Sequence, residues 1–316
     1  MSDKALIVGV GLGGLLCGQI LRRKGWKVTL LEADDAPGGV LRPFLWEGTL
    51  CERGFHSVGG LGPGEPLEKL FRPLGLMELP WYRAGADEGF PFLRLNSGSD
   101  YELEHILGPY KQSTWRLKGG GQCLVDALAS DLDIRCGKEV TGIENQVVIC
   151  KDGERFEAPV VISSLPPVQS LGLLKDHLRP SYAHRLRKLE TGPGITTLYC
   201  RTAPGCVPWQ SGAIFLEDLM LHFGEPETGI LELLCFGEGQ PEQMIEKASR
   251  RLPGLQVQSY LLCQNHGYGI RKHSAVDFVA PRTPLPWFFL SGENLGLHGI
   301  LGTTITAYNT CKTIES

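Results

Sequence analysis

The chain has 316 residues, of which 42% are hydrophobic and 21% are charged, as is ordinary for a globular protein. Its formal net charge of −4 gives no basic field that would hold a polyphosphate, so nucleic acid is not an expected partner. Its ten cysteines form no CxxC pair and no zinc-type Cys/His spacing, which indicates a reducing compartment and predicts no metal site.

The first apolar stretch, Ala5–Leu21, carries no charge but contains five glycines. A membrane-spanning helix needs about 20 consecutive apolar residues, so this stretch is too short and too glycine-rich for one. We interpret it as a strand and the start of a helix inside a soluble fold, and we expect a cytoplasmic protein.

A glycine motif follows that first strand. Gly9-Val10-Gly11-Leu12-Gly13-Gly14 opens a helix that ends at Gly25, and a second strand over 27–31 ends at Glu32. In such a unit the first glycine permits a tight turn, the second lets a pyrophosphate approach the backbone, and the last lets the helix pack on the strand. Glu32 can accept hydrogen bonds from a ribose diol. The pattern predicts a dinucleotide site.

The residues after Glu32 separate FAD from NAD. Glu32-Ala33-Asp34-Asp35-Ala36-Pro37-Gly38-Gly39 resembles the E-x5-GG extension of the flavin amine oxidase and phytoene desaturase superfamily. In that superfamily the glycine pair lies over the pyrophosphate and ribityl chain, so the resemblance implies FAD. An arginine commonly follows the pair, whereas this chain has Val40 there. Arg42 either takes over that role or is a surface arginine.

The middle of the chain alternates between strands and helices. A helix over Glu65–Leu76 has an apolar face that either packs on the core or makes a peripheral contact with a membrane. A helix follows the glycines after Leu117. The remaining predictions are strands at 131–135, 138–143, 146–150, 158–163, 194–200, 213–215 and 229–236, a hairpin turn at 152–153, and an amphipathic helix over Pro241–Leu252.

The end of the chain repeats the features of a cofactor site. Residues 287–293 are typical of a buried strand that enters a turn, Asn294–Gly302 is a glycine-rich loop, and Thr303–Tyr308 starts a helix. This resembles the C-terminal FAD motif of the same superfamily. The N-terminus of the last helix would point at the flavin or the pyrophosphate.

Four segments narrow the resemblance to the phytoene desaturase and retinol saturase-like branch: Gly54–Gly60, Trp115–Gly121, Gly267–Ile270 and Asn294–Gly302. This branch implies an FAD-dependent oxidoreductase that desaturates or saturates carbon–carbon bonds of an apolar, isoprenoid- or polyene-like substrate. Its electron donor or acceptor stays unidentified. The chain is a shortened member, and the missing length falls either between Leu107 and Trp115 alone or also within residues 168–284, which suggests a more open site or a different substrate.

We therefore expect an α/β fold with two interleaved parts. Residues 1–58, 115–167 and 285–316 would form a Rossmann-like FAD-binding domain with a mostly parallel sheet and helices. Residues 59–114 and 168–284 would form an α+β substrate domain. Two other functions remain open, namely flavin amine oxidase-type oxidation of C–N bonds and a non-catalytic FAD-binding relative.

The isoalloxazine carries flavin chemistry, so the protein's own groups orient the reactants and exchange protons. Three candidates for such a group are His56, Tyr268 and His298, each of which could instead be a packing residue. The expected cofactor contacts are Gly9, Gly11, Leu12, Gly13, Gly14, Glu32, Ala33, Gly38, Gly39, Arg42, Val140, Gly292, Glu293, Gly299, Ile300, Gly302 and Thr303.

Overall fold

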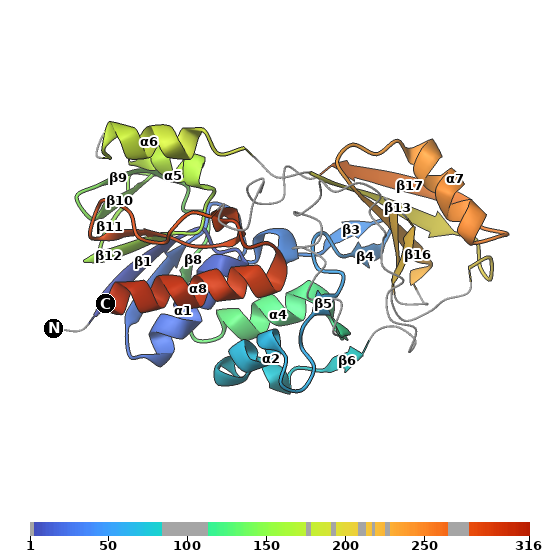
Figure 1. Cartoon of the computed structure of the whole chain (residues 1–316), viewed down its shortest axis with the longest axis horizontal. Coiled ribbons are helices and arrows are strands. Elements are labelled where there is room, and N and C mark those ends of the chain that lie inside the picture. The colour runs from blue at the N-terminus through green and yellow to red at the C-terminus, as the bar shows by residue number, and fades with distance from the viewer. Residues whose placement is uncertain are drawn as a thin grey trace.

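The structure, a computed structural model, describes residues 3–83, 113–174, 178–190, 194–207, 213–216, 219–224, 228–264 and 278–316. Figure 1 shows a sheet flanked by helices at one end of the molecule and a second sheet with one helix on it at the other. The segment that carries β3 and β4 lies between them.

The first sheet is parallel and has the order β18-β12-β1-β2-β8. Its central strand is apolar and buried, because helices or loops cover both faces of such a sheet. The last of these strands in the chain, β18, pairs with β12 and is the last strand on one side of this sheet, where Phe289 also makes a single antiparallel bridge with Arg282. The strands are β1 (Lys4–Val8), β2 (Lys27–Leu31), β8 (Asp133–Arg135), β12 (Val160–Ser163) and β18 (Phe288–Leu290). The predicted Rossmann-like sheet is confirmed.

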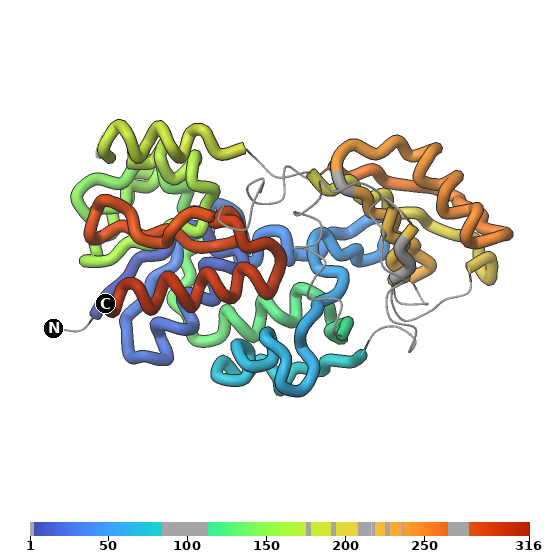
Figure 2. The backbone as a smooth tube through the Cα atoms, in the orientation of Figure 1, coloured from blue at the N-terminus to red at the C-terminus, as the bar shows by residue number. Residues whose placement is uncertain are grey.

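Three helices cover one face of this sheet: α1 (Leu12–Arg23), α4 (Gly120–Ala129) and α8 (Gly299–Glu315). α1 ends two residues before the predicted Gly25, which adopts a left-handed conformation with φ +88°. The last helix, α8, packs beside the first helix, α1, so the two ends of the chain lie at the same side of the molecule (Figure 2). α8 begins at Gly299, four residues before the predicted start.

A second layer covers the other face. It contains an antiparallel sheet of β9 (Val140–Glu144), β10 (Val147–Cys150) and β11 (Arg155–Glu157), with α5 (Pro167–Leu173) and α6 (Pro180–Arg187). The hairpin predicted at Asp152-Gly153 joins β10 and β11, and the amide of Gly153 donates to Cys150.

The larger antiparallel sheet has the order β14-β15-β16-β13-β17. Its strands are β13 (Ile195–Thr202), β14 (Ala213–Leu216), β15 (Leu219–Phe223), β16 (Ile230–Phe236) and β17 (Val257–Gln264). The predicted amphipathic helix is α7 (Pro241–Arg251), which buries Met244 and Ala248 against Leu231 and Leu233. Because side chains alternate along a strand, Glu232 points to the opposite face.

Short elements link the two sheets. They are β3 (Phe44–Trp46), β4 (Thr49–Cys51), β5 (Val58–Gly59), α2 (Pro66–Phe71), β6 (Trp81–Arg83) and β7 (Thr114–Leu117). The helix predicted over Glu65–Leu76 breaks into α2 and two 3-10 turns around Pro73 and Gly75. Its apolar side chains Leu67, Phe71 and Leu74 are buried in the core, so packing accounts for the amphipathic pattern. Within the described ranges no helix is both long and apolar enough to cross a membrane.

Candidate functional site

The first and last glycine motifs of the chain meet in space. A Cβ atom placed on Gly13 would lie 3.0 Å from the Cα of Gly292 and 3.6 Å from the Thr303 methyl group. The Cys17 thiol of α1 also donates to the Ser291 hydroxyl, 3.2 Å away. The two segments that the sequence suggests for FAD therefore lie together at the carboxyl ends of the parallel strands, where dinucleotides bind in such folds.

The first glycine loop has the shape that a pyrophosphate requires. A Cβ atom on Gly14 would overlap the carbonyl oxygen of Gly9, whereas one on Gly11 would meet no atom within 4 Å. Gly11 is the N-cap of α1 and offers no side-chain hydrogen bond to the first-turn amides. Open space beside Gly11 and uncapped amides together fit a phosphate group.

Glu32 is held in place at the end of β2. Its carboxylate accepts hydrogen bonds from the amides of Val10, at 2.8 Å, and Asp34, at 3.1 Å. Its backbone carbonyl accepts from the amide of Lys138, two residues before the candidate contact Val140 at the start of β9. Glu32 is thus fixed beside the glycine loop, where a ribose diol would reach it.

The glycine pair Gly38-Gly39 lies over this loop. Both residues have positive φ angles, +119° and +54°, and a Cβ atom on Gly39 would come 3.4 Å from the Cα of Gly11. Arg42 turns back on its own loop, where its guanidinium contacts Asp35 at 3.0 Å and the carbonyl of Ala36 at 3.3 Å.

The C-terminal motif gives the second half of the candidate cofactor site. Glu293 follows Gly292 in a 3-10 turn, and burial raises the pKa of its carboxyl to about 7. His298 is the N-cap of α8, and its side chain is buried. A Cβ atom on Gly302 would overlap the backbone of Leu297, so only glycine allows this close turn. Gly299 and Ile300 form the first turn of α8 beside it.

Residues 52–58, which we call the strap, connect the glycine pair to α8. A Cβ atom on Gly54 would lie 3.0 Å from the Val40 carbonyl oxygen, and just beyond the strap one on Gly60 would lie 3.9 Å from the Leu301 side chain. His56 sits near the middle of the strap. It therefore comes from the segment that runs between the two halves of the candidate cofactor site.

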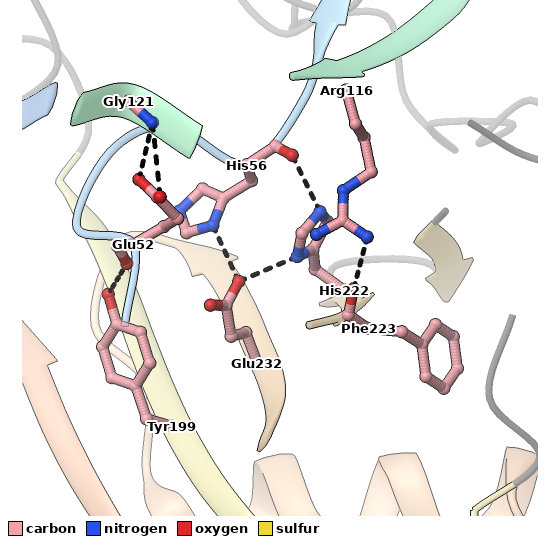
Figure 3. Close-up of polar contacts among 8 residues, drawn as sticks. All are labelled: Glu52, His56, Arg116, Gly121, Tyr199, His222, Phe223 and Glu232. Carbon is pink, nitrogen blue, oxygen red and sulfur yellow. Dashed lines mark hydrogen bonds and ion pairs between the residues drawn. The ribbon is translucent and has the colours of Figure 1, made fainter. Parts of the chain in front are cut away.

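His56 joins a buried polar cluster with the large antiparallel sheet (Figure 3). One oxygen of Glu232 lies 2.7 Å from Nδ1 of His56 and 2.8 Å from Nδ1 of His222, both within hydrogen-bond distance. Nε2 of His222 lies 3.0 Å from the backbone oxygen of His56. Burial alone would raise the pKa of Glu232, but the two imidazoles outweigh it and hold that pKa well below its ordinary range.

The residues of the sheet that hold the strap form a single cross-strand row. His222 of β15 is opposite Glu232 of β16, which is opposite Tyr199 of β13. The Tyr199 hydroxyl donates to the backbone oxygen of Glu52 at 2.6 Å. Glu52 in turn accepts two contacts of 3.2 Å from the Gly121 amide at the start of α4. The row therefore binds the strap at both Glu52 and His56 (Figure 3).

Sequence reasoning missed Glu52, Tyr199, His222 and Glu232. The signal available was a polar residue within an apolar strand, as in Ile230-Leu231-Glu232-Leu233-Leu234. The pairing of β15 with β16, and their approach to the strap, could not be predicted from that signal. The candidate Tyr268 lies outside the described residues.

A surface hollow lined by Lys4, Trp26 and Phe156 opens at the amino ends of β1 and β2. It is at the opposite end of the strands from the glycine loop, so we do not assign the cofactor to it.

Comparisons with known proteins agree with this arrangement. Residues 7–74 match the NAD(P)-binding Rossmann-like domain, and residues 77–217 match the family described as flavin containing amine oxidoreductase. A solved oxidoreductase structure from Methanosarcina mazei superposes with a TM-score of 0.75 at 19% identity, covering 98% of this chain and 100% of that one. This last similarity shows the fold.

Two curated relatives match over short stretches. The all-trans-retinol 13,14-reductase of Danio rerio is 34% identical over 77 residues, which are 24% of this chain and 13% of that protein. The phytoene desaturase (neurosporene-forming) of Cereibacter sphaeroides is 50% identical over 38 residues, 12% of this chain and 7% of that protein. The matched stretches thus span only a small part of either relative.

The cofactor of the matched flavin-containing family is FAD, and the uncapped helix, the open space beside Gly11 and the oriented Glu32 carboxylate fit it. With its Rossmann unit and its flavin-containing oxidoreductase match, the chain belongs to the flavin amine oxidase superfamily.

Proposed function

We propose that this chain is an FAD-dependent oxidoreductase that desaturates or saturates carbon–carbon bonds of an apolar, isoprenoid- or polyene-like substrate. The observation that supports it most is the meeting of Gly9–Gly14 with Gly292–Gly302, which brings together two helix N-termini that would hold the cofactor. The short matches to a retinol reductase and a phytoene desaturase favour the carbon–carbon class.

The proposed cofactor contacts divide between the two halves of the site. Gly9–Gly14 and Glu32 would hold the adenosine and pyrophosphate, while Gly38-Gly39 and the start of α8 would hold the flavin half. Bound FAD would supply the acceptor or donor of a hydride. The protein would contribute orientation, exclusion of water, and a group that exchanges the accompanying proton, for which we propose His56 or His298.

Flavin spectroscopy without oxygen tests this proposal. All-trans-retinol or phytoene, solubilised in detergent, is mixed with the FAD-bound protein, and with the same protein after reduction by dithionite. We expect one of the two flavin states to be converted to the other, with a product that differs from the substrate by two hydrogen atoms in mass. Glu32→Ala protein, freed of FAD, is the control for non-enzymatic change.

Amine oxidation is the second candidate, because residues 77–217 match a family whose description names amines. Putrescine and a secondary amine are therefore tested in parallel. Flavin reduction by an amine, with release of an aldehyde, would replace the carbon–carbon proposal. No flavin change with either class would favour the non-catalytic alternative.

A further inference from the structure

The protons of the His56 cluster can be counted from its contacts. Nε2 of His222 faces a backbone carbonyl oxygen, which only accepts, so this nitrogen carries a proton. Nδ1 of His222 and Nδ1 of His56 both face one oxygen of Glu232, at 2.8 and 2.7 Å. A carboxylate and a bare imidazole nitrogen repel each other, so a proton lies in each of these two contacts as well.

This inventory gives the buried Glu232–His222 pair no net charge. Glu232 is anionic, because the imidazoles lower its pKa, and His222 then carries two protons as its counter-ion. Burial lowers the pKa of His222 overall, and the hydrogen bond with Glu232 offsets only part of that shift, so the second proton on His222 is inferred from its contacts rather than from its pKa. The contact with Glu232 places a proton on Nδ1 of His56. The paired charges suit side chains that are only 1% and 4% exposed.

A divalent metal ion is a poorer occupant of the same position. Zinc lies about 2.0–2.2 Å from nitrogen and oxygen ligands, and a tetrahedral site then separates those ligands by roughly 3.3 Å. The two nitrogen–oxygen separations of 2.7 and 2.8 Å are shorter and have the length of charge-assisted hydrogen bonds. The buried Arg116 guanidinium, which donates to the Phe223 carbonyl beside His222, adds a positive charge that also disfavours a cation.

We propose that Glu232 and His222 are positioning residues that hold His56 as its Nδ1–H tautomer, leaving Nε2 as the nitrogen that exchanges the substrate's proton. This rests on the proposed function. Nδ1 of His56 is used by Glu232, while Nε2 makes no hydrogen bond within the ranges that the structure describes. The His56 side chain also keeps 11% of its surface exposed, more than either partner.

The reaction balances with this assignment. Desaturation of a CH–CH unit removes one hydride and one proton from neighbouring carbons, leaving a double bond. Bound FAD would accept the hydride with both electrons, and Nε2 of His56 would accept the proton, which would make the ring an imidazolium. Glu232 faces the Nδ1–H of that ring and stabilises the new positive charge. Saturation is the reverse, with Nε2 donating the proton.

The tautomer is measured without any substrate, so a wrong substrate class would leave this result unchanged. A long-range proton–nitrogen correlation spectrum of the FAD-bound, histidine-labelled protein shows which ring nitrogen carries the proton, with His56→Gln providing the assignment. We expect Nδ1–H for His56 in the parent protein and a shift toward Nε2–H in Glu232→Gln. Nε2–H in the parent protein, or a stoichiometric metal in the purified protein, would overturn the proposal.

Kinetics separate positioning from simple docking, because Tyr199→Phe removes a hydrogen bond of the same row without touching His56. We expect Glu232→Gln to slow proton-coupled flavin reduction or reoxidation by on the order of 10²-fold. We also expect it to displace the pH profile, while Tyr199→Phe changes neither by more than about 3-fold. The charged and titratable groups around His56 are Glu52, Arg116, Tyr199, His222 and Glu232, so the profile is compared between variants.

Equal slowing by both variants with an unchanged pH profile would mean that the row only docks the sheet, and would overturn the proposal. If the tautomer is as expected but neither polyenes nor retinoids change the flavin in the parent protein, the proposed carbon–carbon function is what fails. In that case the same two variants are compared with whichever substrate the parent protein accepts.

Discussion

Single glycines in the first loop are required for two different physical reasons. Gly14 has no room for a Cβ atom, because one would overlap the carbonyl oxygen of Gly9. Gly11 has room, since nothing lies within 4 Å of such an atom, and its φ of −73° suits any residue. The empty space beside Gly11 is where a pyrophosphate would approach the backbone. Gly14 is therefore required for folding, whereas we expect Gly11 to be required for binding the pyrophosphate.

We expect Gly11→Ala to keep the parent protein's thermal unfolding midpoint to within about 2 °C while losing most of its FAD. Gly14→Ala should lower soluble yield, since the backbone itself must move. Unfolding of both FAD-free proteins is followed by circular dichroism, and FAD content by absorbance after acid precipitation. Retention of full FAD by Gly11→Ala would contradict the assignment of the pyrophosphate to this loop.

Glu32 is the residue whose predicted role and observed position agree most directly. Glu32→Ala removes a carboxylate that would accept two ribose hydrogen bonds, each worth about 1.5–3 kcal/mol, so FAD affinity should fall by about 100-fold or more. Asp34→Ala is the matched control, because the exposed Asp34 offers Glu32 only its backbone amide. Equal FAD affinity in the two variants, measured by titration of the apoprotein, would remove the ribose role.

At the scale of elements, the first turn of α4 packs against Glu52, a residue far from it in sequence. Its first turn, Gly120-Gly121, has no space for side chains, because Cβ atoms there would overlap the Glu52 carboxylate and the Leu41 carbonyl oxygen. This accounts for the glycine run after Lys118, which marks a tight approach between the strap and α4. The approach buries Glu52, and burial raises the pKa of its carboxyl from 4.5 to about 7.

This shift predicts a pH dependence. Between pH 5 and 7 the unfolded chain has lost the Glu52 proton while the folded protein retains it, so the free energy of unfolding falls as pH rises. Glu52→Gln can still accept from Gly121 but has no charge to bury. Its stability relative to the parent protein should therefore increase by about 1–3 kcal/mol from pH 5 to pH 8. Urea unfolding at four pH values measures this, and parallel curves would show that Glu52 is not buried as a charge.

Elements defined by local pattern were predicted well. β2 and α7 lie within about one residue of their predicted bounds, and α1 ends two residues before the predicted Gly25, because hydrophobic period and a terminal glycine define these elements locally. Two predictions were wrong: the start of α8 at Thr303, and a continuous helix over Glu65–Leu76, which instead breaks after α2. Tight packing of Gly302 on Leu297 determines the first, and Pro73 and Gly75 shape the second. Pairings between distant segments, such as His56 with Glu232, depend on sheet register, which no local pattern encodes.

At the scale of the whole molecule, the chain closes its candidate cofactor site with its last described residues. β18 adds to β12 at one edge of the parallel sheet, and α8 lies along α1 with Ala307 and Cys311 fully buried. Gly292 contacts Gly13 across some 280 residues of intervening chain. We therefore expect the two halves of the candidate site to fold and unfold together.

Truncation after Pro286 should for this reason yield colourless, aggregation-prone protein. It removes β18, exposes the edge of β12, and uncovers the apolar face of α1. The milder His298→Ala should keep both fold and colour, because it changes only the N-cap side chain of α8. Gel filtration with detection of protein and flavin absorbance distinguishes these outcomes. A soluble, yellow truncated protein would place the flavin half elsewhere.

The cross-strand row also sets a rule for exchanging parts between flavoproteins. Tyr199, Glu232 and His222 come from three strands of one sheet, yet each of them contacts the backbone or the His56 ring of the strap, which lies outside that sheet. A chimaera that takes this sheet from a relative would replace Tyr199, His222 and Glu232 and lose their contacts with the strap. We expect such a chimaera to fold correctly only when the sheet and the strap come from the same parent protein, because their contacts are then kept.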